Sequence, residues 1–184
     1  MKKNLPLYLY GAIIIAEGVF LILSEDSAFQ AIKFPLGMGL IIGSIFAFLT
    51  AFTRKRSQVQ FAYHEIHALT MLVYGLSVLF CNTLEVLTKL TAFLLVFYGF
   101  SELIFCSWLF NLEKKIYYKI LLVRVAIALL ASIGAVISLS YSYLNIEWTI
   151  SGFGALFILI GINVILYVPI IQENEGNDVN ADTI

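Results

Sequence analysis

Residues 90–110 read LTAFLLVFYGFSELIFCSWLF, an almost unbroken apolar run with one ionisable side chain, Glu102. A run of about 20 apolar residues is long enough for one helix to cross the hydrocarbon core of a bilayer. A carboxylate at that depth is costly unless it is paired, protonated or turned toward a cavity. The run therefore predicts a transmembrane helix that carries a polar group in need of a partner.

The composition of the 184-residue chain extends this interpretation to most of its length. Hydrophobic residues make up 61% of the chain and charged residues only 12%, whereas a soluble domain is about half apolar and about a quarter charged. Because one soluble core cannot hold so many apolar residues, we expect the lipid bilayer to be the main partner of the chain. The formal net charge of −1 gives no reason to expect a nucleic-acid partner.

Five further apolar runs flank the first one and are separated from it by short polar links. The six runs span residues 5–23, 36–52, 68–84, 90–110, 120–139 and 148–171. We therefore expect an all-α polytopic membrane protein with six transmembrane helices in a domain of residues 1–171. Pro35 is expected in the first turn of the second helix, where proline is tolerated. The acidic segment 172–184 has no apolar period, and we expect a disordered cytoplasmic tail there.

The basic residues predict the orientation in the membrane. With six spans and the N-terminus inside, 9 of the 11 Lys and Arg residues lie on one side, and only Lys33 and Lys89 lie on the other. Positively charged residues accumulate on the cytoplasmic side of membrane proteins. Both termini are therefore expected in the cytoplasm.

Glycines recur near the middle of the apolar runs at similar spacing. They are Gly18, Gly75 and Gly134 in the odd runs, and Gly43, Gly99 and Gly161 in the even runs. We interpret the recurrence as three tandem two-helix hairpins, at about residues 5–56, 62–115 and 119–171. Helices in lipid approach closely only at small residues, so we expect these glycines, and Gly39 in a GxxxG pair with Gly43, at helix contacts in a pseudo-threefold bundle. The same faces would serve contacts between chains, which leaves a homo-oligomer open.

Four polar residues inside the runs form the candidate site: Glu17, Glu102, Arg124 and Asn163. We predict an ion pair between Glu102 and Arg124, because the two lie at similar depths on neighbouring helices. The alternative is that Arg124 extends to the cytoplasmic headgroups. Glu17 has no obvious basic partner, so we expect it to be neutral or to face an aqueous cavity. Asn163 is expected to pack between helices, and the alternative is a hydrogen bond to Glu17 or Glu102.

The HEIH sequence from His64 to His67 has only a superficial likeness to a metal site. It is one residue shorter than the His-Glu-x-x-His pattern of zinc proteases, and no third ligand is evident. We expect a solvated group at the membrane interface, with a cytoplasmic pH sensor as the alternative. No metal, cofactor or catalytic motif is expected, so the chain is interpreted as a non-enzyme. Cys81 and Cys106 are expected to be small buried residues that do not pair.

The three hairpins, the mid-helix glycines and the Gly-Phe-Ser-Glu segment at 99–102 resemble the HdeD family of small bacterial inner-membrane proteins. The resemblance covers about residues 5–171. It implies a bacterial inner-membrane location and a contribution to acid or envelope stress tolerance, because the family's named member is associated with acid resistance at high cell density. The alternative is a small channel or transporter for a proton-coupled solute or a weak acid. The chain departs from the family in that Phe46 and Val164 align with Glu102 in the other two repeats.

Overall fold

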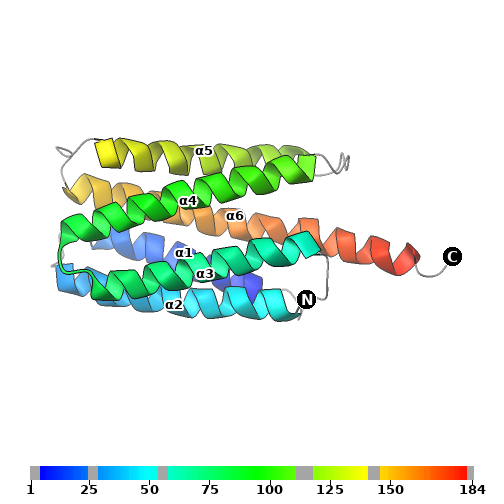
Figure 1. Ribbon diagram of the computed structural model, residues 1–184, viewed down its shortest axis with the longest axis horizontal. Coiled ribbons are helices and arrows are strands. Elements are labelled where there is room, and N and C mark those ends of the chain that lie inside the picture. The colour runs from blue at the N-terminus through cyan, green and yellow to red at the C-terminus, as the bar shows by residue number, and fades with distance from the viewer. Residues whose placement is uncertain (1–4, 25–28, 54–57, 111–117, 141–145, 182–184) are drawn as a thin grey trace.

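The computed structural model contains six α-helices, and its described residues include no strand (Figure 1). The described backbone covers residues 5–24, 29–53, 58–110, 118–140 and 146–181, and within it the side chains of 51–53, 58–64, 109, 146–147 and 168–181 are left aside. The helices are α1 (Leu5–Leu23), α2 (Phe29–Thr53), α3 (Gln58–Phe80), α4 (Leu84–Phe110), α5 (Tyr118–Ser140) and α6 (Ile146–Ala181).

Five of these helices are long and apolar enough to cross a membrane. Their apolar spans are Leu5–Leu23, Phe29–Thr50, Leu84–Trp108, Tyr118–Ser140 and Trp148–Tyr167, whereas the apolar part of α3 is the shorter segment Glu65–Phe80. Large apolar side chains such as Phe93 and Ile104 are exposed on the outside of the bundle. A surface of this kind suits lipid rather than water, and the helices indicate a multi-pass membrane protein.

Several helix ends differ from the predicted ones: α3 spans Gln58–Phe80 instead of 68–84, and α4 begins at Leu84 instead of residue 90. α2 begins at Phe29, so Pro35 lies inside the helix rather than in its first turn. Ile32 is fully buried in the turn before the proline, and its packing holds that turn in the helix although proline removes one backbone hydrogen bond. α6 continues to Ala181, so residues 172–181 are helical where we expected a disordered tail. Extending an existing helix is far less costly than starting one.

Three pairs of helices make the most extensive contacts: α1 with α6, α2 with α3, and α4 with α5. In Figure 1, the last helix, α6, lies beside the first one, α1. In the first and third pairs the backbones approach too closely for a larger residue, and in the second pair a Cβ added to Gly75 would lie 3.0 Å from the carbonyl oxygen of Gly37. A Cβ atom added to Gly18 would lie 2.5 Å from the carbonyl oxygen of Gly154, and one added to Gly99 would lie 2.8 Å from that of Ala128.

Small buried residues seven positions apart occur on both helices of all three pairs. They are Gly11 and Gly18 with Gly154 and Gly161 in α1 and α6, Ala68 and Gly75 with Gly37 and Ser44 in α3 and α2, and Ala128 and Ala135 with Ala92 and Gly99 in α5 and α4. Two helical turns separate the members of each set, so both lie on one face of the helix. Such a face lets two helices in lipid make close van der Waals contact.

The glycines expected at helix contacts divide into two groups. Four of them lie at close backbone contacts: Gly18, Gly75, Gly99 and Gly161. The other three lie opposite side chains: Gly39 against Glu17, Gly43 against Tyr10 and Ile13, and Gly134 against Leu156. The GxxxG pair therefore does not mark a close backbone crossing, because its face meets side chains of α1.

Two glycines of α6 provide a direct test of the close contacts. A Cβ added to Gly154 would lie 2.6 Å from the carbonyl oxygen of Gly18, whereas one added to Gly152 would meet nothing within 4 Å. We expect Gly154→Ala to reduce the free energy of unfolding in detergent by about 1–3 kcal/mol, because the two backbones must move apart. Gly152→Ala is the matched control and should be neutral or slightly stabilising. Equal stability of the two variants would contradict the close contact.

Candidate functional site

Glu102 on α4 and Arg124 on α5 form an ion pair in the interior of the bundle. Arg124 donates from Nε and from Nη2 to Oε1 of Glu102, each at 2.6 Å. The side chains are 0% and 1% exposed. Removing either partner would leave an uncompensated buried charge. The predicted pair is confirmed, and the alternative in which Arg124 extends to the headgroups is wrong, because the carboxylate offers the guanidinium a partner inside the bundle.

The same guanidinium connects α5 to α6. Arg124 Nη1 donates to the backbone carbonyl of Asn163 at 3.0 Å, and Asn163 Nδ2 donates to the hydroxyl of Tyr98 on α4 at 2.5 Å. Asn163 thus lies between helices as expected, but its side chain binds Tyr98 instead of Glu17 or Glu102. Its Oδ1 is buried with no hydrogen-bond partner among the described residues. These bonds join α4, α5 and α6 in one polar network, which we call the charged network.

Two aromatic rings, one on α4 and one on α6, pack against the guanidinium group of the charged network. The Cζ atom of Arg124 lies 4.9 Å from the ring centroid of Tyr167 and 5.5 Å from that of Phe105. The two rings pack edge to face, with their centroids 5.3 Å apart. A cation over an aromatic ring is stabilised most when water is excluded. The sulfur of Cys106 also lies 3.6 Å from Oε1 of Glu102, which surrounds the carboxylate further.

The position of His67 differs from the expected one. Its side chain is 6% exposed and its ring packs edge to face on Tyr98, with the centroids 5.4 Å apart. The expectation of a solvated interfacial histidine is wrong for His67, because α3 begins at Gln58 and carries this residue well into the bundle. The side chain of His64 lies outside the described residues. Within the described part of the chain, no group of His, Cys, Asp and Glu could hold a metal ion.

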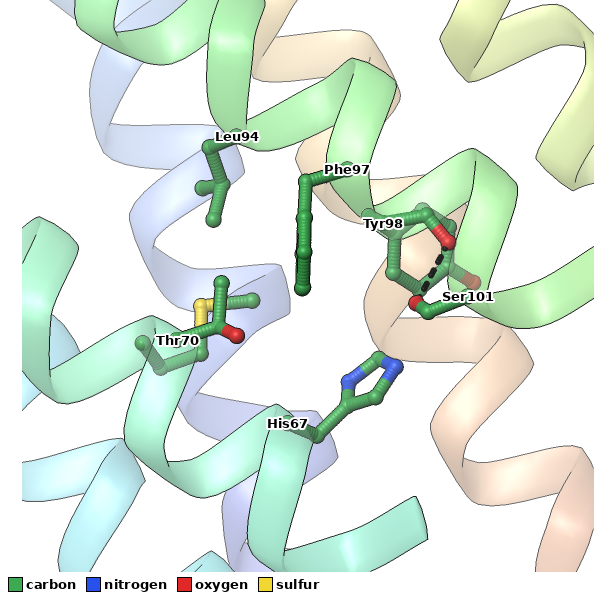
Figure 2. Close-up of a pocket in the computed structure, with 7 residues that line it drawn as sticks. His67, Thr70, Leu94, Phe97, Tyr98 and Ser101 are labelled. Carbon is green, nitrogen blue, oxygen red and sulfur yellow. Dashed lines mark hydrogen bonds between the residues drawn. The ribbon is translucent and has the colours of Figure 1, made fainter.

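A small cavity adjoins His67 between α3 and α4 (Figure 2). Its volume is about 10 Å³, and it is lined by His67, Thr70 and Met71 of α3 and by Leu94, Phe97, Tyr98 and Ser101 of α4. Figure 2 shows the imidazole of His67 extending from α3 toward Tyr98 and Ser101. The space admits one group the size of a water molecule, and its walls include polar atoms that could bind such a group.

Glu17 on α1 is not part of the charged network. It packs against Gly39 of α2, where any side chain on the glycine would overlap its carboxylate. Its Oε2 is buried with no hydrogen-bond partner among the described residues. Tyr74 of α3 is close enough to interact electrostatically with Glu17, and its hydroxyl bonds to that of Thr91 on α4 at 2.6 Å. The structure thus brings Glu102, Arg124 and Asn163 together and leaves Glu17 in a second polar cluster.

Buried apolar side chains separate the two clusters along each helix. Ile14 lies about one turn before Glu17 on α1, Met71 lies between His67 and Tyr74 on α3, and Leu95 lies between Thr91 and Tyr98 on α4, each 2% exposed or less. Water needs polar partners to occupy a buried position. Apolar packing thus separates the polar residues of α3 and of α4 from one another along each helix.

Two residues of the site were missed in the sequence, Tyr98 and Tyr167, whereas His67 was singled out but expected at the membrane interface. Helical spacing from Glu102 could have found the first of them, because residues four positions apart share a helix face. The comparison of the chain with protein families, curated proteins and solved structures finds no match. Function must therefore be inferred from the buried polar groups themselves.

A double-mutant cycle tests the ion pair. We expect Glu102→Leu alone or Arg124→Met alone to reduce the free energy of unfolding by about 3 kcal/mol, because each leaves one buried charge without its partner. The double variant should be more stable than the sum of the single effects predicts, with a coupling free energy of about 1–3 kcal/mol.

The matched control for the cycle is the exposed pair on the same helix, Glu85 and Lys89, at 2.6 Å. Glu85→Gln should leave the unfolding midpoint unchanged, because exposed ion pairs contribute little. Additive single effects at Glu102 and Arg124 would show that the two charges act independently, against the geometry described here.

Proposed function

We propose that the chain is a non-enzymatic integral membrane protein of the HdeD type that contributes to tolerance of acid or envelope stress in a bacterial inner membrane. The observation that carries the proposal is the difference between its two intramembrane carboxylates. Glu102 is neutralised by Arg124, whereas Glu17 has a buried oxygen without a hydrogen-bond partner and no basic partner among the described residues. A carboxylate in apolar surroundings responds to acid when no cation holds its charge.

The proposed response begins at Glu17. When Glu17 takes up a proton, its charge disappears and its carboxyl group becomes a hydrogen-bond donor. The contact of α1 with α2 at Gly39 then changes from a charged one to a neutral one. Glu102 has a different part in this mechanism, because protonating it would leave the guanidinium of Arg124 buried without a counter-charge. The charged network holds α4, α5 and α6 together while the contact of α1 responds.

We further propose that α3 crosses the membrane as a sixth span and that three tandem hairpins, α1–α2, α3–α4 and α5–α6, form a pseudo-threefold bundle with both termini cytoplasmic. The three most extensive helix contacts join each hairpin to the next, and the last hairpin to the first. The small residues seven positions apart support one common register for the three contacts. In that register Ala47, rather than Phe46, corresponds to Glu102, together with Val164.

The second candidate is a small channel or transporter for a proton-coupled solute or a weak acid. The cavity beside His67 favours it, because that cavity brings polar groups next to the charged network. The apolar layer at Ile14, Met71 and Leu95 opposes a permanently open pore, so transport would require these side chains to move. Solute flux into proteoliposomes that is lost on Glu102→Gln, in a folded protein, would favour this candidate over the first.

The test of the proposal is the survival of a deletion strain after acid challenge at high cell density. Wild type should restore survival, and Glu17→Gln should fail to restore it although the variant inserts at the wild-type level, because glutamine cannot titrate. Glu85→Gln is the control and should restore survival fully, since Glu85 is exposed in the first turn of α4.

Membrane abundance of each variant, measured by immunoblot, separates loss of function from loss of protein. Full rescue by Glu17→Gln would overturn the proposed role of this carboxylate. A deletion strain that survives acid as well as its parent would overturn the proposed stress function itself.

A further inference from the structure

The cavity beside His67 lies between α3 and α4, just inside the lipid-facing surface (Figure 2). Two of its lining residues, Met71 and Leu94, are nearly fully buried, whereas Phe97 is about half exposed. Its volume of about 10 Å³ is close to that of a single water-sized probe. The cavity therefore accepts one very small molecule.

The cavity lies at a helix contact that lacks close backbone packing. Gly75 of α3 meets α2, and Gly99 of α4 meets α5. The contact of α3 with α4 is less extensive than either of these two contacts. Polar groups on the facing sides of α3 and α4 therefore offer a different kind of link between these helices.

Two hydroxyl groups of the lining have already used their protons. Thr70 Oγ1 donates to the carbonyl of Ile66 at 2.7 Å, and Ser101 Oγ donates to the carbonyl of Tyr98 at 2.9 Å (Figure 2). Because a hydroxyl has one proton and two lone pairs, both oxygens remain acceptors. Thr70 is on α3 and Ser101 is on α4, so a molecule that bridges the two must donate two hydrogen bonds.

The rest of the lining restricts the ligand further. In the view of Figure 2, the imidazole of His67 lies between Thr70 and Ser101, and a neutral imidazole has one N–H donor and one acceptor nitrogen. The lining includes no Lys, Arg, Asp or Glu, so a charged ligand would have no counter-charge there. A divalent cation would also need about six oxygen ligands, more than the hydroxyl groups of the lining supply.

We propose that the cavity binds one water molecule, which donates to Thr70 Oγ1 and Ser101 Oγ and shares a third hydrogen bond with the imidazole of His67. Water is uncharged, fits the volume and has two protons to donate, and buried water molecules typically make about three hydrogen bonds. Because His67 packs on Tyr98, whose hydroxyl belongs to the charged network, the water links α3 to α4 beside that network. The site is independent of the proposed response at Glu17.

Two methionines allow a test in the wild-type protein. Met71 lines the cavity and is 2% exposed, whereas Met38 of α2 is 37% exposed on the outside of the bundle. X-ray pulses convert water into hydroxyl radicals, which oxidise a nearby methionine to its sulfoxide. In the full-length protein in lipid nanodiscs, Met71 should be oxidised faster than Met38 although it is the more buried of the two, because lipid keeps water away from Met38. Peptide mass spectrometry measures both rates, and buffer water enriched in oxygen-18 identifies the oxygen that comes from water.

A double variant tests the hydrogen bonds assigned to the water. Thr70→Val with Ser101→Ala removes both acceptors and keeps Met71 in place. The oxidation rate of Met71 should then fall to that of Met38, because water needs polar partners to occupy a buried position. The thermal unfolding midpoint of the variant must match that of the wild type for this rate to count.

Ser77→Ala is the matched control. Ser77 Oγ donates to the carbonyl of Val73 at 2.8 Å, as Thr70 does to that of Ile66, but Ser77 is not part of the cavity lining. This variant removes a hydroxyl of the same kind from the same helix. It should leave the oxidation rate of Met71 unchanged.

The comparison of Met71 with Met38 in the wild type needs no substitution, so it tests the site whether or not the double variant folds. Oxidation of Met71 at or below the rate of Met38 would overturn the proposal, because no water would then be bound beside it. An unchanged rate at Met71 in a folded double variant would show that the two hydroxyl groups do not hold the water. An equal loss in Ser77→Ala would assign the effect to a general change in α3 and would also overturn the proposal.

Discussion

The bundle depends on close backbone contact at small residues, because helices in lipid gain no hydrophobic free energy from meeting one another. The contact of α1 with α6 uses four glycines, Gly11, Gly18, Gly154 and Gly161. The contact of α4 with α5 uses one glycine, Gly99, and otherwise alanines. The buried ion pair of Glu102 and Arg124 bridges this contact with the fewest glycines. At the contact of α4 with α5, the attraction between the two buried charges thus adds to the van der Waals packing of the helices.

The two intramembrane carboxylates, Glu102 and Glu17, lie in different surroundings. Glu102 accepts two charge-assisted bonds from one guanidinium, and aromatic rings exclude water around that guanidinium. Glu17 lies over a glycine on the far side of an apolar layer. The first carboxylate holds three helices together, and the second has no basic partner among the described residues.

Composition and hydropathy predict the helices because about 20 apolar residues have one stable form in lipid. Depth along neighbouring helices predicts the ion pair of Glu102 and Arg124. The face of the GxxxG pair was not predictable from its spacing, because spacing alone does not say whether a backbone or a side chain lies opposite. The position of His67 was predicted wrongly because α3 begins at Gln58, within a polar segment that we did not expect to be helical. The cavity beside His67 depends on how closely α3 and α4 approach, which no local sequence pattern records.

The pairing of α1 with α6 has a consequence for how the chain is made. These are the first and last helices to leave the ribosome, yet they form the most extensive contact in the bundle. Contacts between distant parts of a chain form late because a long loop must close first. The glycine face of α1 therefore lacks its partner helix until α6 has been synthesised. A chain truncated before α6 would keep its other apolar spans but would leave the glycine face of α1 without its partner helix.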